Sequence, residues 1–81
     1  MQARKVIPEV ILGQEIARLR RRIGISQEEL GFRAEVHRTY ISQLERGLKS
    51  PTLGILLKLS RALKIPASTI VDHVDRESVR K

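Results

Sequence analysis

Apolar residues recur every three or four positions over residues 10–23, which is the period of one buried face of an amphipathic helix. The arginines of this segment crowd its last turns, where the helix dipole favours positive charge, and Gly24 follows as a terminator. We therefore predict a first helix over residues 10–23, preceded by an N-terminal arm of residues 1–9 that shows no helical period. The residues on its apolar face are Leu12, Ile16, Leu19 and Ile23.

A short second helix is predicted to begin at Ser26. Ser26 and Glu29 have the spacing of a capping box, in which the serine side chain accepts a hydrogen bond from the first turn and the glutamate reaches back to the cap. Leu30 and Ala34 supply the apolar contacts of this helix, and the pattern breaks at residues 35 and 36.

A third helix follows this break and ends at Gly47. Ile41 and Leu44 lie three positions apart and mark its buried face. Its other face is a stripe of hydrogen-bonding side chains, Arg38 at the N-terminal edge and then Thr39, Ser42, Gln43 and Arg46. Two short helices joined by a tight turn, the second with an outward polar stripe, indicate an element that reads DNA.

Two more helices complete the prediction of an all-α domain over residues 10–74. Thr52 is the expected N-cap of a fourth helix that is apolar around its circumference and is therefore expected to be central. After a loop at residues 65 and 66, a fifth helix carries Ile70, Val71 and Val74. This apolar surface either covers the domain's own core or meets a second copy of the chain. Residues 75–81 are charged, and we expect a fraying tail.

The length and net charge of the chain limit the kinds of partner it could bind. The 81 residues form one small domain, and their net charge of +7 favours a polyanion, either a phosphate backbone or an acidic membrane surface. No apolar run approaches the roughly 20 residues that span a membrane, and no signal segment opens the chain, so we expect a cytoplasmic protein. The absence of cysteine agrees with a reducing compartment.

Duplex DNA is the favoured polyanion. Phe32 and Tyr40 are the only aromatic residues, too few for a surface that stacks unpaired bases. The major groove admits an α-helix, and arginine and glutamine can pair with guanine and adenine there. The alternative is that the stripe is an ordinary solvated face, because most surface helices carry one.

No catalytic or metal-binding constellation is present. His73 lies between Asp72 and Asp75, but these neighbours do not share a helical face, and His37 has no thiol partner. A nucleophile, a base and an acid cannot be placed in a cleft of so small a helical domain. We expect neither an enzyme nor a metal, cofactor or small-molecule ligand.

Four segments, LRRRIGISQEEL, RTYIS, QLERG and SPTL, together resemble the Cro/repressor-type (Xre-like) helix-turn-helix domains. The stretch HRTYISQLERGLKSPTL is similar to the controller proteins of restriction–modification systems in particular. The resemblance covers roughly residues 12–74. It implies a compact five-helix domain that binds double-stranded DNA and regulates transcription.

The resemblance also implies roles for individual residues. The glutamine that opens the second helix, here Gln27, would bind a phosphate, and an ion pair would join Arg20 to Glu45. The positions that match base-reading residues are Arg38, Thr39, Ser42 and Gln43. The positions that match contacts to the sugar-phosphate backbone are Tyr40, Arg46, Lys49 and Ser50.

Two positions depart from the pattern of these domains. Glu35 stands where glycine is usual in the turn, so the turn is either strained at a positive φ or differs locally. His37 stands where serine, threonine or aspartate usually caps the third helix, which leaves the cap hydrogen bond in question.

A homodimer on a pseudo-palindromic operator is the leading hypothesis, because one recognition helix reads only a few base pairs. Its interface would include Ile70, Val71 and Val74. As a controller, the protein would regulate itself and time the expression of a neighbouring nuclease. The alternatives are an antitoxin-type module that neutralises another protein and an interaction module that has lost DNA binding.

Overall fold

The computed structural model describes residues 7–78, and its described part contains five α-helices and no strand. This confirms the predicted all-α, five-helix fold class. The helices are α1 (Pro8–Arg22), α2 (Gln27–Ala34), α3 (Arg38–Glu45), α4 (Leu53–Leu63) and α5 (Ala67–Ser78).

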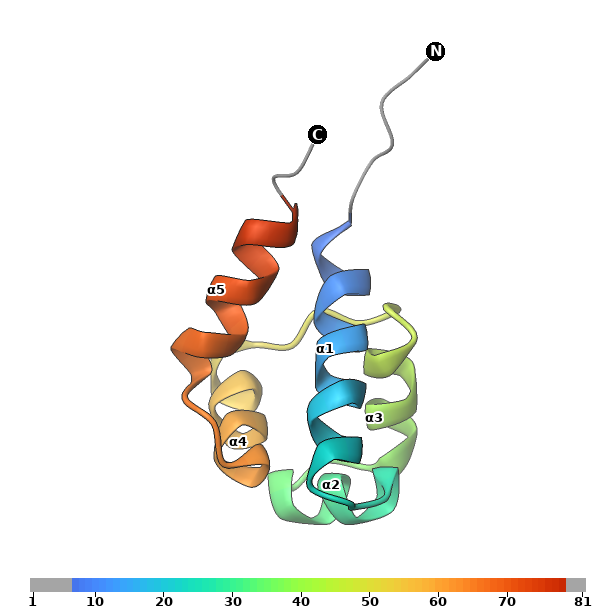
Figure 1. Ribbon diagram of the computed structural model, residues 1–81. Coiled ribbons are helices and arrows are strands. Elements are labelled where there is room, and N and C mark those ends of the chain that lie inside the picture. The colour runs from blue at the N-terminus through green and yellow to red at the C-terminus, as the bar shows by residue number, and fades with distance from the viewer. Residues whose placement is uncertain (1–6, 79–81) are drawn as a thin grey trace.

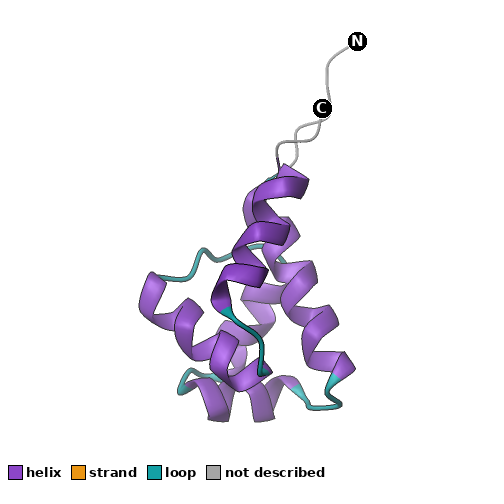
Figure 2. Cartoon of the chain, turned by 60° about the vertical axis from the view of Figure 1, so that its left-hand side comes forward, coloured by secondary structure: helices purple, strands orange, loops and turns teal. Residues whose placement is uncertain are grey.

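Helix α1 runs through the middle of the bundle (Figure 1). It packs against α3 on one side and α5 on the other, while α2 crosses its C-terminal end and contacts α3 and α4. Figure 2 shows short loops between the helices, of which the longest, residues 46–52, leads from α3 to α4. The chain therefore holds α3 by one face, against α1 and α2.

The predicted apolar faces meet in one core. Every helix contributes to it, and its largest fully buried side chains are Ile16, Leu19, Leu30, Ile41, Leu44, Leu59 and Ile70. The expectation that the fourth helix is central is only partly right. Its C-terminal half is buried, but Leu53 at its start is 72% exposed and the charged Lys58 and Arg61 interrupt its apolar surface. Helix α1, and not α4, lies at the centre of the bundle.

Two helices are longer than predicted. Helix α1 begins at Pro8, because proline in a first turn needs no N–H partner and already has a helical φ. Helix α5 continues to Ser78, past the predicted start of the tail. Its extra turn is supported by Arg76, whose Nε donates to the Asp72 carboxylate at 3.0 Å one helical turn earlier. Residues 1–6 of the expected arm and 79–81 of the expected tail lie outside the described residues.

Candidate DNA-binding surface

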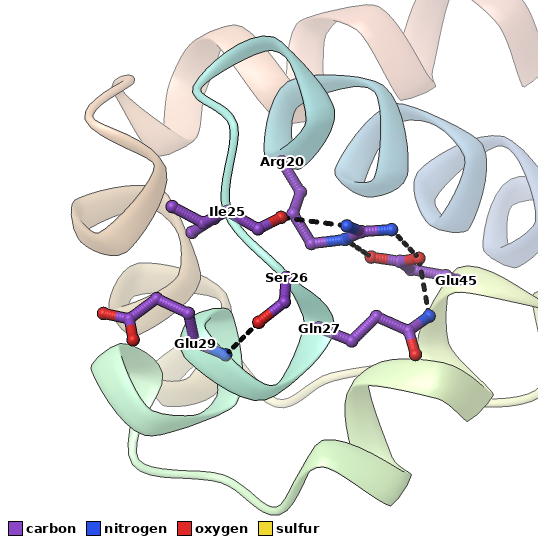
Figure 3. Close-up of polar contacts among 6 residues, drawn as sticks. All are labelled: Arg20, Ile25, Ser26, Gln27, Glu29 and Glu45. Carbon is purple, nitrogen blue, oxygen red and sulfur yellow. Dashed lines mark hydrogen bonds and ion pairs between the residues drawn. The ribbon is translucent and has the colours of Figure 1, made fainter.

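The second helix begins as its sequence predicts. The Ser26 Oγ accepts a hydrogen bond from the Glu29 N–H at 3.0 Å, which satisfies one of the free amides of the first turn (Figure 3). The other half of the predicted capping box differs. The Glu29 carboxylate accepts from the Arg33 Nε at 2.7 Å, one turn further along α2. The pair stabilises the exposed face of α2 and leaves the serine as the cap.

The turn between α2 and α3 has the positive φ that the sequence raised as one possibility. Glu35 is left-handed, with φ 61° and ψ 37°, a conformation that costs a non-glycine residue free energy. Its carboxylate lies 2.9 Å from the Lys58 Nζ of α4. The hydrogen bond from Lys58 and the lysine charge lower the pKa of Glu35 below its ordinary value.

The glycine that this turn requires lies earlier, at Gly31. A Cβ there would lie 2.7 Å from the Val36 carbonyl oxygen, closer than packed atoms allow. The chain can therefore double back from α2 into α3 because residue 31 has no side chain. The sequence does not reveal this role, since a glycine inside a helical pattern carries no sign of what will pack on it.

Helix α3 has a side-chain N-cap. His37 is the N-cap residue of α3, and its Nδ1 accepts a hydrogen bond from the Thr39 N–H at 3.0 Å. The question left by the sequence is thereby answered: the imidazole replaces the usual hydroxyl or carboxylate. Helix α3 starts at Arg38, so Arg38 and Thr39 occupy its first turn.

Buried anchors fix which face of α3 points outward. Ile41 and Leu44 are fully buried in the core. On the other sides, Arg38, Thr39 and Arg46 are exposed, and Ser42 and Gln43 are half-buried. Within residues 7–78 none of these polar side chains forms a hydrogen bond or ion pair. The predicted stripe is therefore one contiguous set of donors and acceptors without partners inside the domain.

The predicted backbone-contacting residues border this stripe. Tyr40 is half-buried on α3, and this burial raises the pKa of its hydroxyl. Lys49 and Ser50 are exposed in the loop that follows α3. The structure thus places the Tyr40 phenol on α3, and the Lys49 ammonium and the Ser50 hydroxyl in the loop beyond its C-terminal end.

A polar network ties the start of α2 to the end of α3 and to α1 (Figure 3). The Arg20 guanidinium donates from Nε to Glu45 Oε2 at 2.7 Å and from Nη2 to Glu45 Oε1 at 3.1 Å, which is the bidentate pair implied by the resemblance. Its Nη1 donates to the Ile25 carbonyl at 2.9 Å. The two side chains are only 12% and 6% exposed.

Gln27 belongs to the same network, a contact that the sequence did not predict. Its Nε2 donates to Glu45 Oε1 at 2.9 Å, which fixes the orientation of the amide (Figure 3). One amide hydrogen remains for another acceptor. The contact spans 18 residues along the chain, so no local pattern could have revealed it.

Helix α3 also lies unusually close to α1. A Cβ on Gly13 would lie 2.3 Å from the Leu44 carbonyl oxygen and 2.8 Å from that of Glu45. Only glycine permits this approach. Together with the Arg20 network, it fixes α3 in position and orientation on a rigid support, as precise recognition requires.

The predicted dimer residues on α5 divide into two groups. Ile70 is fully buried in the domain's own core, so its assignment to an interface is wrong: its apolar surface already has partners within the chain. Val71 is 48% exposed, and Val74 lines a shallow hollow together with Pro8, Leu12, Pro51 and Leu56. Val71 and Val74 remain available to a second molecule.

Glu15 is a second buried charge, at the contact between α1 and α5. Glu15 is buried on α1 and lies 2.6 Å from the Arg18 Nη2 and 3.6 Å from the His73 Nε2 of α5. The hydrogen bond from Arg18 is the main cause of a lowered Glu15 pKa, against the opposing effect of burial. In the described part of the chain, no group of three histidine or acidic side chains is arranged to hold a metal ion.

None of the helices within residues 7–78 has both the length and the apolar character needed to cross a bilayer.

Comparison with known proteins identifies the class. A helix-turn-helix family matches residues 16–70, and the chain belongs to this family; its fold is the Cro/repressor-type (Xre-like) one. The control protein C.BamHI of Bacillus amyloliquefaciens is 36% identical over 64 residues, which cover 78% of this chain and 79% of that protein. The regulator SinR of Bacillus subtilis is 35% identical, over 78% of this chain and 58% of its own length.

A solved structure gives the same result. The restriction–modification controller protein C.AhdI from Aeromonas hydrophila is 38% identical and superimposes with a TM-score of 0.73, over 75% of this chain and 92% of that one. The chain is a DNA-binding transcriptional regulator of the helix-turn-helix class. Within that class, its similarity extends to the controller proteins.

Proposed function

We propose that this protein binds a pseudo-palindromic operator in double-stranded DNA as a homodimer and acts as the controller of a restriction–modification system. The observation that supports DNA reading most strongly is the stripe on α3, whose polar side chains have no partner within residues 7–78 while its buried face is fixed. The similarity to C.BamHI and C.AhdI supports the role of controller. Because its target is DNA, we place the protein in the cytoplasm.

Base reading is assigned to the groove-facing stripe. Arg38 and Thr39 stand in the first turn of α3, the part of a recognition helix that meets base edges, and Ser42 and Gln43 follow one turn later. Arg38 suits the two acceptors of guanine, and Gln43 suits the donor and acceptor of adenine. We assign recognition of the DNA base sequence to these four residues.

Phosphate contacts are assigned to the residues around the stripe. The Gln27 amide, held by Glu45, has one hydrogen left for a phosphate oxygen near the N-terminus of α2. Tyr40, Arg46, Lys49 and Ser50 supply the remaining contacts from α3 and the loop after it. Such contacts set the register of the helix in the groove and give binding a steep dependence on salt.

Dimerisation is assigned to the exposed part of α5. Val71 and Val74 present apolar surface beside the hollow lined by Pro8, Leu12 and Leu56. A two-fold pair would place its recognition helices one DNA turn apart, roughly 34–36 Å. No structural observation favours the alternative of an antitoxin-type module.

The test of DNA reading is selection of bound duplexes from a random pool, followed by titration of variants on the selected site. We expect Arg38→Ala to lose about 1–3 kcal/mol of discrimination at one base pair and Gln27→Ala to weaken all duplexes alike. Arg76→Ala is the matched control, since it removes the same charge from α5. Unchanged specificity in Arg38→Ala would contradict the assignment.

The test of dimerisation is sedimentation with and without the selected duplex. Val71→Glu should shift the protein toward monomer, whereas Phe32→Glu, an equally drastic change at an exposed apolar residue of α2, should not. A monomer at micromolar concentration that also binds the duplex singly would overturn the dimer.

A further inference from the structure

The cap of the recognition helix is a titratable group. His37 Nδ1 accepts from the Thr39 N–H at 3.0 Å, and the first turn of α3 contains no acidic residue. The caps of α2 and α4 are the hydroxyls of Ser26 and Thr52, which keep their acceptors at every physiological pH. The helix that carries the polar stripe is therefore capped differently from its neighbours.

Protonation would remove this cap. A neutral imidazole that accepts at Nδ1 carries its proton on Nε2, whereas an imidazolium has a proton on both nitrogens and no acceptor. The charged ring would also stand at the positive end of the α3 dipole, where cations are unfavourable. Histidine is the side chain that ordinarily changes charge between about pH 5 and pH 8.

The charged side chains of α3 and of the neighbouring elements would do little to stabilise a protonated His37. Arg38 is the next residue on α3 and is positive. In the turn after α2, the Glu35 carboxylate is engaged by Lys58 of α4, and on α2 the Glu29 carboxylate is engaged by Arg33. No acidic residue stands in the first turn of α3 to stabilise an imidazolium at residue 37, and Arg38 adds a like charge beside it.

We propose that His37 is a positioning residue that makes sequence discrimination depend on pH. In its neutral form it holds the first turn of α3, and with it Arg38 and Thr39, in the orientation that meets base edges. In its charged form it releases that turn, while the added positive charge preserves or increases attraction to any phosphate backbone. Acid therefore weakens specific binding relative to non-specific binding. The inference rests on the proposed base-reading function of α3.

The cap itself is tested on the free protein by NMR. The Thr39 amide resonance should shift, and its hydrogen exchange accelerate relative to buried α3 amides, when the free protein is taken from about pH 8 to pH 5.5. In His37→Asn, whose side-chain oxygen caps without titrating, the Thr39 amide should show no such transition. If the resonance and exchange rate of the Thr39 amide do not change when the His37 ring is protonated, the proposed role of this cap is refuted.

Discrimination is tested with the duplex selected at pH 8 and a scrambled duplex of the same length. For the unmodified protein, the ratio of the two affinities should fall about three- to tenfold from about pH 8 to pH 5.5, the range expected for loss of one N-cap hydrogen bond. His37→Ala should lower the ratio at both pH values, and His37→Asn should restore it and make it independent of pH. His73→Gln, at the only other histidine, is the control and should keep the pH dependence.

The outcomes separate the two claims. If no duplex is preferred at any pH, the proposed function fails, and the Thr39 amide still reports whether the cap titrates. If a duplex is preferred but its ratio is constant with pH, or changes equally in His37→Asn, the role of His37 is refuted and the proposed function stands.

Discussion

The Arg20–Glu45 pair should be the most strongly coupled ion pair of the domain. Glu45 accepts three side-chain hydrogen bonds, two from Arg20 and one from Gln27, and is 6% exposed. Its removal leaves the guanidinium nearly buried, with the Ile25 carbonyl as its remaining acceptor. Breaking a buried pair costs about 3–5 kcal/mol. Because Arg20 keeps that one carbonyl, we expect Glu45→Met to cost about 3 kcal/mol of unfolding free energy.

A double-mutant cycle measures the coupling. Arg20→Met and Glu45→Met keep much of the volume of each side chain and remove its charge, so their double variant replaces the pair by apolar contact. We expect the double variant to be less destabilised than the sum of the single variants by at least about 2 kcal/mol. Urea unfolding followed by circular dichroism gives the four free energies, provided that the slopes agree.

The exposed pair on α5 is the matched control. Arg76 and Asp72 are 75% and 56% exposed, and their cycle should give less than about 0.5 kcal/mol, reduced further in 1 M salt. The coupling of Arg20 to Glu45 should survive that salt. If the buried cycle gave a coupling as small as the exposed one, the inference that this network fixes α3 on α1 would be refuted.

Three further predictions test the packing and charge of the fold. Gly13→Ala should lower the unfolding free energy by more than about 2 kcal/mol, because its Cβ would lie 2.3 Å from a backbone carbonyl of α3. Gly54→Ala, with no neighbour closer than 4.0 Å, should raise it by up to about 1 kcal/mol. Thermal unfolding measures both variants, and equal effects would contradict this prediction. Lys64→Gly should raise the urea midpoint by the equivalent of about 0.5–1 kcal/mol, because Lys64 ends α4 at φ 61°; a lower midpoint would show that the left-handed residue is unstrained. The pKa of Glu15 is lowered in the folded state, chiefly by the hydrogen bond from Arg18, so its stabilising effect is complete above the ordinary value of 4.5 and is lost as the pH falls below it. Glu15→Gln should therefore flatten the decline of the urea midpoint in acid, and an unchanged slope would refute this.

Local signals in the sequence predicted the helices well. The three-to-four residue period identified the buried residues Ile16, Leu19, Ile41 and Leu44. The Ser26 cap also formed as expected. These signals work because a helical period and a cap depend on residues within one or two turns of each other.

Because these signals are local, the sequence could not predict contacts between residues that are distant along the chain. The sequence could not show that Ile70 faces the domain's own core, because an apolar stripe does not name its partner. The need for glycine at residue 31 depends on the Val36 carbonyl that packs on it, which no helical pattern reveals. At His37 the contact is local, but the sequence does not fix the side-chain rotamer that brings Nδ1 within 3.0 Å of the Thr39 N–H.

The sequence by itself determined an all-α fold, the apolar faces of the first three helices and the polar stripe of residues 38–46. The tertiary structure decided how that stripe is held: Gly13 lets α3 lie on α1, and Arg20, Gln27 and Glu45 lock the two short helices together. The physical reason is distance along the chain. Periodicity and capping are properties of neighbours in sequence, whereas these contacts join residues that become neighbours only when the helices pack.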